Sequence, residues 1–172
     1  MNLYDYNKEQ KMEIERKFLV KKEQLPSHLF RYPHSELEQA YIITNPVLRI
    51  RKKDSEYILT YKGQGLMARE EVEFPLPEEA YQKLATKCEG NLITKTRYRI
   101  PEKDQLTIEL DIFHGILEGL YLAEVEFKDE ATALSYVPPC WFDKEVTQTN
   151  TFHNSTLSKM EKDAIKELIA SL

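Results

Sequence analysis

Acidic and basic residues alternate near the start of the chain. Residues 13–17 read Glu-Ile-Glu-Arg-Lys, so an extended strand would place Glu13, Glu15 and Lys17 on one face. Two carboxylates about 7 Å apart along a strand suit a hard divalent cation, and the lysine suits an anion held by that cation. For a single pattern of this kind, the simpler interpretation is an edge strand with a solvated face. The interpretation as a site therefore depends on repetition further along the chain.

The same alternation returns in most of the segments that follow. The charged positions that share one face are Arg49 and Arg51; Lys62; Arg69, Glu71 and Glu73; Lys95, Arg97 and Arg99; Glu109 and Asp111; and Glu124 and Glu126. The opposite positions are mainly apolar, as at Leu48, Ile50 and Val125. A one-residue slip would exchange the two faces of a strand, so this pattern specifies the register strongly.

Eight strands and three helices are needed to position these residues. The expected strands are residues 12–20, 38–44, 47–53, 56–62, 67–76, 92–100, 105–113 and 120–128. The first helix is expected to begin at Pro77 and to end at Gly90, and the others to cover residues 129–137 and 157–172. Most connections between the strands are short, which favours antiparallel neighbours.

Two architectures agree with this pattern. In a flat sheet the charged face would meet water, whereas in a closed barrel the charges would line a polar tunnel. The charged faces contain few Ser, Thr, Asn or Gln residues, although an ordinary solvated face is usually more mixed. Buried like charges need partners, and a polyphosphate with divalent metals would provide them: arginine and lysine bind phosphate oxygens, and carboxylates bind the metals.

Composition limits the class of protein. The chain has 172 residues, of which 41% are hydrophobic and 31% charged, and this suits one globular domain. A net charge of −5 argues against a general nucleic-acid or membrane-surface binder. Two cysteines are too few for a disulfide framework, and the chain shows no signal peptide or membrane-length apolar run. We expect a polar tail over residues 1–11, one domain over residues 12–172, and a cytoplasmic location.

The ordered motifs resemble those of the CYTH superfamily, the triphosphate tunnel metalloenzymes, and in particular its small bacterial members. The resemblance extends from Met12 to the last helix and rests on these segments: Glu13-Ile-Glu-Arg-Lys17, Arg49-Ile-Arg51, Thr60-Tyr-Lys62-Gly63, Arg69-Glu-Glu71-Val-Glu73-Phe, Lys95-Thr-Arg97-Tyr, Glu109-Leu-Asp111-Ile-Phe113, Gly119-Leu120, Ala123-Glu124-Val-Glu126-Phe and Lys144-Glu-Val-Thr147. It implies an α+β fold in which an eight-stranded antiparallel closed β-barrel forms a tunnel and helices pack outside. It also implies hydrolysis of inorganic tripolyphosphate with Mg²⁺ or Mn²⁺.

The resemblance also assigns roles by position. Metal would be bound by Glu13, Glu15, Glu124 and Glu126. Phosphate groups would be bound by Lys17, Arg49, Arg51, Lys62, Lys95 and Arg97, and Arg69 would bind phosphate or pair with the acidic residues. The candidates for a second metal or for positioning the attacking water are Glu71, Glu73 and Asp111, and Lys144 is expected to close over the substrate. Phe152 departs from the tyrosine common in similar proteins. The four histidines show no ligand spacing, so none is expected to be a metal ligand or a base.

Alternative functions remain open. The same tunnel can serve a class IV-type adenylate cyclase or a thiamine triphosphatase, because fold does not settle substrate. A non-catalytic polyphosphate-binding protein is a third possibility, but binding an anion alone would not need the carboxylates. We expect a small anionic triphosphate as the partner, no nucleic acid or membrane, and a monomer or homodimer.

Overall fold

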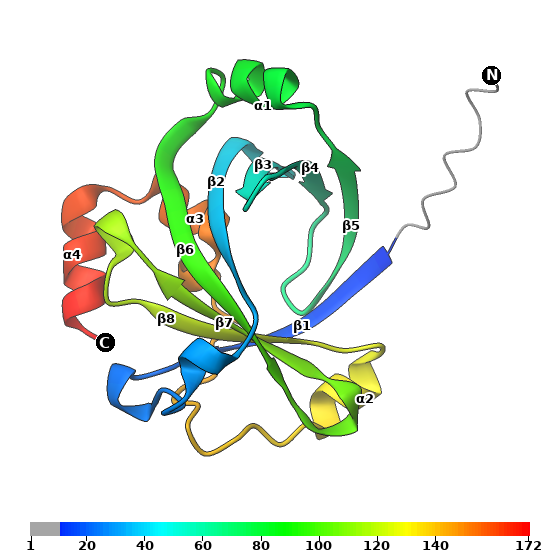
Figure 1. Ribbon diagram of the computed structural model, residues 1–172, viewed down its shortest axis with the longest axis vertical. Helices are drawn as coiled ribbons and strands as arrows, with labels where there is room; N and C mark the ends of the chain where they lie inside the picture. Colours follow the sequence, from blue (N-terminus) through cyan, green and yellow to red (C-terminus); the bar gives the residue numbers. More distant parts are fainter. Residues whose placement is uncertain (1–10) are drawn as a thin grey trace.

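A closed antiparallel barrel of eight strands forms the centre of the computed structural model, which describes residues 11–172 (Figure 1). The strands are β1 (Lys11–Leu19), β2 (His34–Thr44), β3 (Val47–Lys53), β4 (Glu56–Lys62), β5 (Ala68–Pro75), β6 (Glu89–Pro101), β7 (Thr107–Phe113) and β8 (Tyr121–Glu126). Their order around the barrel is β1-β5-β4-β3-β2-β6-β7-β8. The expected closed barrel is confirmed. Closure pairs the strand edges that a flat sheet would leave open.

Strand β1 closes the ring by pairing with a different neighbour along each half. Its residues 11–14 pair with β5, and its residues 15–19 pair with β8. The segment after the barrel covers the remaining edge of the second half: the Leu19 amide donates to the Lys144 carbonyl (2.8 Å), and the Val146 amide donates to the Lys17 carbonyl (2.8 Å). The strand that carries Glu13, Glu15 and Lys17 is thereby held on both edges.

Within residues 11–172, four α-helices pack on the barrel: α1 (Glu78–Ala85), α2 (Glu130–Ser135), α3 (Asn154–Lys159) and α4 (Lys162–Ala170). Helix α1 lies beside β3 and β4, and α2 lies beside β1 (Figure 1). The Asp129 side chain caps α2 by accepting a hydrogen bond from the Thr132 amide (2.7 Å). Helix α3 contacts β6 and β2, and α4 packs against the turn Gly115–Leu117.

Two apolar clusters stabilise the barrel. One lies on its outer face, where Phe18, Leu110 and Val125 pack with Phe142. The other lies at one end of the barrel, where Leu19, Phe113 and Leu122 pack against residues of the C-terminal segment. Leu19 follows Lys17 by two residues and Phe113 follows Asp111 by two, so these side chains belong to the inner face. One end of the barrel interior is therefore apolar.

The structure corrects three predicted boundaries. The predicted final helix over residues 157–172 is wrong: Met160 is extended (φ −72°, ψ 136°) and separates α3 from α4. The first helix ends at Ala85, and Gly90 lies inside β6, where its φ of +81° favours glycine. Strand β2 begins at His34 because residues 34–37 pair with β6.

The structure tests two other expectations, the polar tail and the lack of a membrane segment, only over the residues that it describes. The predicted tail falls on residues 1–10, which lie outside the described residues, and on Lys11, which begins β1. Over residues 11–172 no helix combines the length and the apolar character needed to cross a membrane. The single-domain division, the cytoplasmic location and the oligomeric state stay predictions.

Candidate active site

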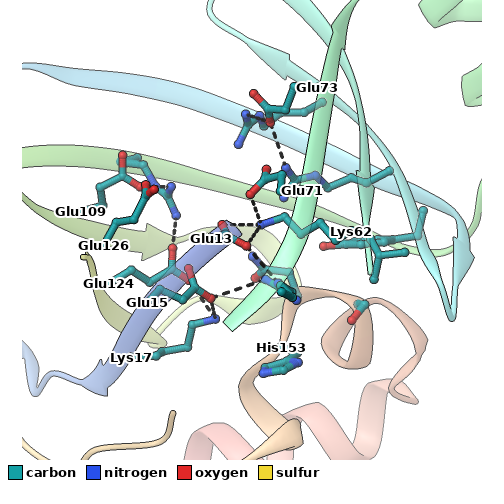
Figure 2. A pocket seen from close by; sticks show the side chains of 18 of the residues that line it. Glu13, Glu15, Lys17, Lys62, Glu71, Glu73, Glu109, Glu124, Glu126 and His153 are labelled. Atoms are coloured by element: carbon teal, nitrogen blue, oxygen red, sulfur yellow. Dashed lines mark hydrogen bonds and ion pairs between the residues drawn. The ribbon is translucent and has the colours of Figure 1, made fainter. Parts of the chain in front are cut away.

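The inward side chains of the barrel surround a cavity of about 470 Å³ (Figure 2). Of the 15 residues assigned to the site from the sequence, the following 13 line it: Glu13, Glu15, Lys17, Arg49, Arg51, Lys62, Arg69, Glu71, Glu73, Lys95, Arg97, Glu124 and Glu126. The two-residue alternation brings them together, because closing the sheet turns one face of each strand inward.

Two predicted site residues do not line the cavity. Asp111 is on the inner face of β7 but has no exposed surface, because the side chains of Lys95 and Arg97 bind its carboxylate. Lys144 is exposed, on the segment that pairs with β1. The structure therefore places Asp111 behind the cations and Lys144 away from the cavity.

Strands β1, β4 and β5 form one charged cluster around Glu13. The Lys62 ammonium donates to both carboxylate oxygens of Glu13 (2.7 and 2.8 Å), and Arg69 Nε donates to Oε2 (2.9 Å). Burial opposes ionisation of Glu13, but Lys62 and Arg69 outweigh it and hold its pKa well below the usual range. Glu71 lies beside Lys62 (3.1 Å), and burial together with the neighbouring Glu13 raises its pKa to about 7.

A second cluster joins β1, β6 and β8 around Glu124. Its carboxylate binds Lys17 (2.9 Å) and Arg97 Nη2 (2.6 Å). Burial would raise the pKa of Glu124, but Lys17 and Arg97 hold it well below its ordinary value. Glu15 is farther from its cations, at 3.7 Å from Lys17 and 3.5 Å from Arg69. Burial and the nearby Glu124 and Glu13 raise the pKa of Glu15. A negative charge on Glu15 is therefore less well compensated than the charge on Glu124.

The cavity opens at the end opposite the apolar cluster. The side chains of Glu73 and Glu109 there are each 38% exposed, whereas that of Lys17 is 6% exposed. Arg51 Nη2 donates to Glu73 (2.8 Å), and Arg97 forms an ion pair with Glu109. The mouth therefore carries glutamates paired with arginines.

The opposite end is closed by residues 150–159, which we call the plug. Phe152 and Leu157 of the plug are buried in the cluster that contains Leu19 and Phe113. His153, Asn154 and Ser155 line the cavity, and Figure 2 shows His153 extending from the plug toward the charged side chains. The plug is thus apolar where it meets the barrel and polar where it faces the cavity.

His153 is a site residue that the sequence did not indicate. Burial, reinforced by the nearby cations Lys17 and Arg69, lowers its pKa to about 4, so the imidazole is neutral at pH 7. Its position in the sequence, between Phe152 and Asn154, has no ligand spacing that could have marked it. Tyr41 is buried in the apolar cluster that contains Leu19 and Phe113, and it also lines the cavity.

Unpaired donors show that the cavity suits an anion. The buried Nε atoms of Arg49 and Arg51 have no hydrogen-bond partner within residues 11–172. Both residues line the cavity, and an unsatisfied buried donor is costly. Phosphate oxygens are the acceptors that guanidinium groups bind well.

The glutamate carboxylates that line the cavity provide the oxygen ligands that a hard cation binds. Glutamate oxygens are the ligands that Mg²⁺ and Mn²⁺ prefer, and a bound cation would favour the charged form of Glu15, which burial disfavours. In the part of the chain that the structure describes, no three acidic, histidine or cysteine side chains are already arranged as a metal centre. Ammonium and guanidinium groups bind these carboxylates instead, so a metal would have to replace some of those contacts.

Comparison with known proteins identifies the family. Residues 11–162 match the CYTH domain. The inorganic triphosphatase of Nitrosomonas europaea is 36% identical over 154 residues, which cover 85% of this chain and 96% of that protein. The inorganic triphosphatase of Acetivibrio thermocellus is 34% identical over 163 residues, covering 90% and 98%.

Solved structures agree in fold. The crystal structure of the inorganic triphosphatase NE1496 superimposes with a TM-score of 0.65 at 35% identity, covering 87% of this chain and 95% of that one. A putative adenylyl cyclase from Hippeastrum, described as having a dominant triphosphatase activity, superimposes with a TM-score of 0.59 at 15% identity. The match covers 71% of this chain and 82% of that one, and at this identity it shows the fold alone. The sequence match and the tunnel of alternating charges lead to the same conclusion, that this chain belongs to the CYTH domain family.

Proposed function

We propose that the protein is a metal-dependent triphosphatase that hydrolyses inorganic tripolyphosphate. One observation carries the proposal: lysine and arginine side chains from β1, β3, β4, β5 and β6 converge on a single cavity, and two of these arginines have a buried Nε atom with no hydrogen-bond partner within residues 11–172. Carboxylates alternate with these cations, and a purely anion-binding site would not need them. Two relatives named inorganic triphosphatase, each more than 30% identical over most of this chain, support the same activity.

The metal that we propose is Mg²⁺ or Mn²⁺. Glu13, Glu15, Glu124 and Glu126 would hold it, since all four line the cavity and provide oxygen ligands. When bound, the ion neutralises phosphate charge and polarises the phosphoryl oxygens.

The basic residues bind and orient the phosphate chain. Lys17, Lys62 and Lys95 are nearly fully buried, so water screens their charges less than it screens surface charges. One pair of unit charges 4 Å apart is worth about 4 kcal/mol at an effective dielectric constant of 20. Several such contacts fix the chain in one orientation, and catalysis of phosphoryl transfer depends mainly on positioning and electrostatics.

Hydrolysis needs a water molecule and a group that accepts its proton. The oxygen of the water attacks a terminal phosphorus, the bridging P–O bond breaks, and the products are orthophosphate and pyrophosphate. Glu71 is the candidate proton acceptor, because it lines the cavity and its pKa is raised to about 7 by burial and by Glu13. Glu73, which also lines the cavity, is the second candidate for positioning the water.

A turnover assay tests the proposal and separates it from the other members of the superfamily. Tripolyphosphate, ATP and thiamine triphosphate are compared in one magnesium buffer, with EDTA as the control. Cyclic AMP and orthophosphate are both measured. We expect the highest kcat/KM with tripolyphosphate and no turnover in EDTA. Cyclic AMP as the main product would establish a cyclase, and binding of all three without turnover would establish a non-catalytic protein.

A further inference from the structure

We propose that Thr147 is a positioning residue for the phosphate-binding side chain of Lys17, and that Arg16 and Glu145 act through Thr147. These residues belong to the first and the last of the ordered motifs in the sequence, and Arg16, Glu145 and Thr147 do not line the cavity. Their hydrogen bonds hold the half of β1 that carries Glu15 and Lys17. This inference rests on the proposed function, since it concerns how Lys17 is placed in the same cavity.

One edge of β1 passes from one neighbour to another beside Glu15. The Glu15 amide donates to the Met67 carbonyl (2.9 Å), directly before β5 begins. Residues 143–147, which we call the strap, then replace β5 and form backbone hydrogen bonds with Lys17 and Leu19. The position of this half of β1 therefore depends on how firmly the strap is held.

A side-chain hydroxyl completes this edge at Lys17. The Lys17 amide donates to Thr147 Oγ1 (3.0 Å), at a place where an antiparallel strand would offer a backbone carbonyl. Both residues are buried, and a buried amide without an acceptor is costly. The hydroxyl therefore fixes the backbone of Lys17, whose side chain lines the cavity and binds Glu124 (2.9 Å).

Glu145 fixes the orientation of this hydroxyl. Thr147 Oγ1 lies 2.7 Å from Glu145 Oε1. The hydrogen bonds from Arg16 hold the pKa of Glu145 below its ordinary value, so the carboxylate is ionised at neutral pH and can only accept. The hydroxyl proton therefore goes to Glu145, and the hydroxyl oxygen is left to accept from the Lys17 amide.

Arg16 binds the carboxylate to the strand whose position it determines. Its Nε and Nη2 atoms donate to Glu145 Oε1 (2.9 Å) and Oε2 (2.7 Å). Its Nη1 atom donates to the carbonyls of Ala133 and Tyr136 at the end of α2 (both 2.9 Å). Because Arg16 directly precedes Lys17 in β1, the strap cannot shift along β1 without breaking these bonds.

Removal of one hydroxyl tests the role of Thr147. Thr147→Val keeps a side chain of similar shape but takes away the acceptor of the Lys17 amide, whereas Thr147→Ser keeps the hydroxyl. We expect kcat/KM for tripolyphosphate in magnesium buffer to fall about tenfold or more in Thr147→Val, because a small misplacement of a binding group has a large effect on rate. Thr147→Ser should retain about half or more of the wild-type value.

Thr96→Val is the matched control. Thr96 is also a buried threonine whose hydroxyl donates to a glutamate, Glu36 (2.8 Å), but it lies on the outer face of β6. Strand β6 pairs with β2 and β7 through its backbone, so the Thr96 hydroxyl does not replace a bond of the barrel. We expect Thr96→Val to change kcat/KM by less than about threefold. Equal losses in Thr147→Val and Thr96→Val would overturn the proposal.

Hydrogen exchange of the Lys17 amide measures the positioning directly. At a temperature at which circular dichroism shows each variant to be folded, this amide should exchange about tenfold or more faster in Thr147→Val than in the wild type or Thr147→Ser. Unchanged exchange would overturn the proposal, and so would faster exchange with unchanged kcat/KM, which is the result of a purely structural role. Glu145→Ala keeps the hydroxyl but no longer orients it, so kcat/KM should fall by a smaller factor. Full activity of Glu145→Ala would contradict the part assigned to Arg16 and Glu145.

Equilibrium binding separates this inference from the proposed function. Pyrophosphate, a product of the proposed reaction, is titrated into each protein in magnesium buffer and followed by calorimetry. We expect binding about threefold or more weaker in Thr147→Val, with little change in Thr147→Ser and Thr96→Val. A wild-type protein that shows this pattern but does not cleave tripolyphosphate would contradict the proposed function and support the positioning of Lys17. Cleavage by the wild type with unchanged binding and kcat/KM in Thr147→Val would do the reverse.

Discussion

Asp111 holds Arg97 in a bidentate ion pair inside the barrel: Nε to Oδ1 and Nη2 to Oδ2 are both 2.6 Å. The two residues are direct partners in the β6–β7 register. Lys95 binds the same carboxylate. One carboxylate with no exposed surface therefore orients two phosphate-binding cations from behind, and both remain on the wall of the cavity.

This arrangement predicts a large loss of stability in Asp111→Asn. The change leaves Lys95 and Arg97 buried without their shared counter-charge, and breaking a buried pair costs about 3–5 kcal/mol. Urea unfolding at pH 7 measures the free energy of unfolding. Tripolyphosphate should restore part of the loss, because its charge replaces the missing carboxylate. A variant as stable as the wild type would show that the pair does not act as described.

Glu15→Gln separates metal chemistry from stability. The raised pKa of Glu15 shows that the fold disfavours its charged form, so a neutral glutamine should leave the melting temperature unchanged or higher at pH 7. Turnover with Mg²⁺ should fall about 100-fold or more, because a proposed metal ligand is lost. The matched control is Glu79→Gln on α1, whose side chain is 82% exposed. Full activity of Glu15→Gln in magnesium would contradict the role.

The sequence predicts the barrel and most of its lining because charge alternates with period two. Thirteen of the 15 assigned residues line the cavity, since closure turns one face of each strand inward. The sequence could not show that Asp111 lies behind Lys95 and Arg97. A residue on the inward face can either line the cavity itself or hold the side chains that line it. Only the packing of neighbouring strands decides between the two positions.

The closed end was harder to predict. The inward residues of β2 include Gln39 and Tyr41, so the inner face of this strand carries no charged pair that could mark it as part of the site. The break between α3 and α4 has no glycine or proline, and the tertiary contact from Asn91 takes up the freed carbonyls. His153 directly precedes α3, and α3 is bound at its other end by Asn91, a residue 66 positions away from Leu157 in the sequence.

The lowered pKa of Lys95 predicts how phosphate binding changes with pH. Burial lowers the pKa of Lys95 to about 8, although Asp111 opposes the shift. The free enzyme therefore loses this cation as the pH rises through about 8, and kcat/KM for tripolyphosphate should fall. In Lys95→Arg the guanidinium stays protonated, so that decline should disappear. The measurement is kcat/KM from pH 6 to pH 10 for both proteins, and identical profiles would rule out Lys95 as the titrating group.

Arg51 and Arg99 provide a matched pair for the phosphate-binding role. Both are partly buried arginines on inward-facing strand positions. Arg51 lines the cavity, and its Nε has no partner among the described residues, whereas Arg99 donates to Ser35 Oγ (3.3 Å) and does not line the cavity. Arg51→Ala should lower kcat/KM for tripolyphosphate by between about 10-fold and 100-fold, since it removes charge-assisted hydrogen bonds to the substrate. Arg99→Ala should change it by less than about threefold. Steady-state kinetics in the same magnesium buffer compare the two, with thermal unfolding as the check on folding. Equal losses in both variants would mean that the total positive charge of the barrel, and not the contact made by Arg51, determines binding.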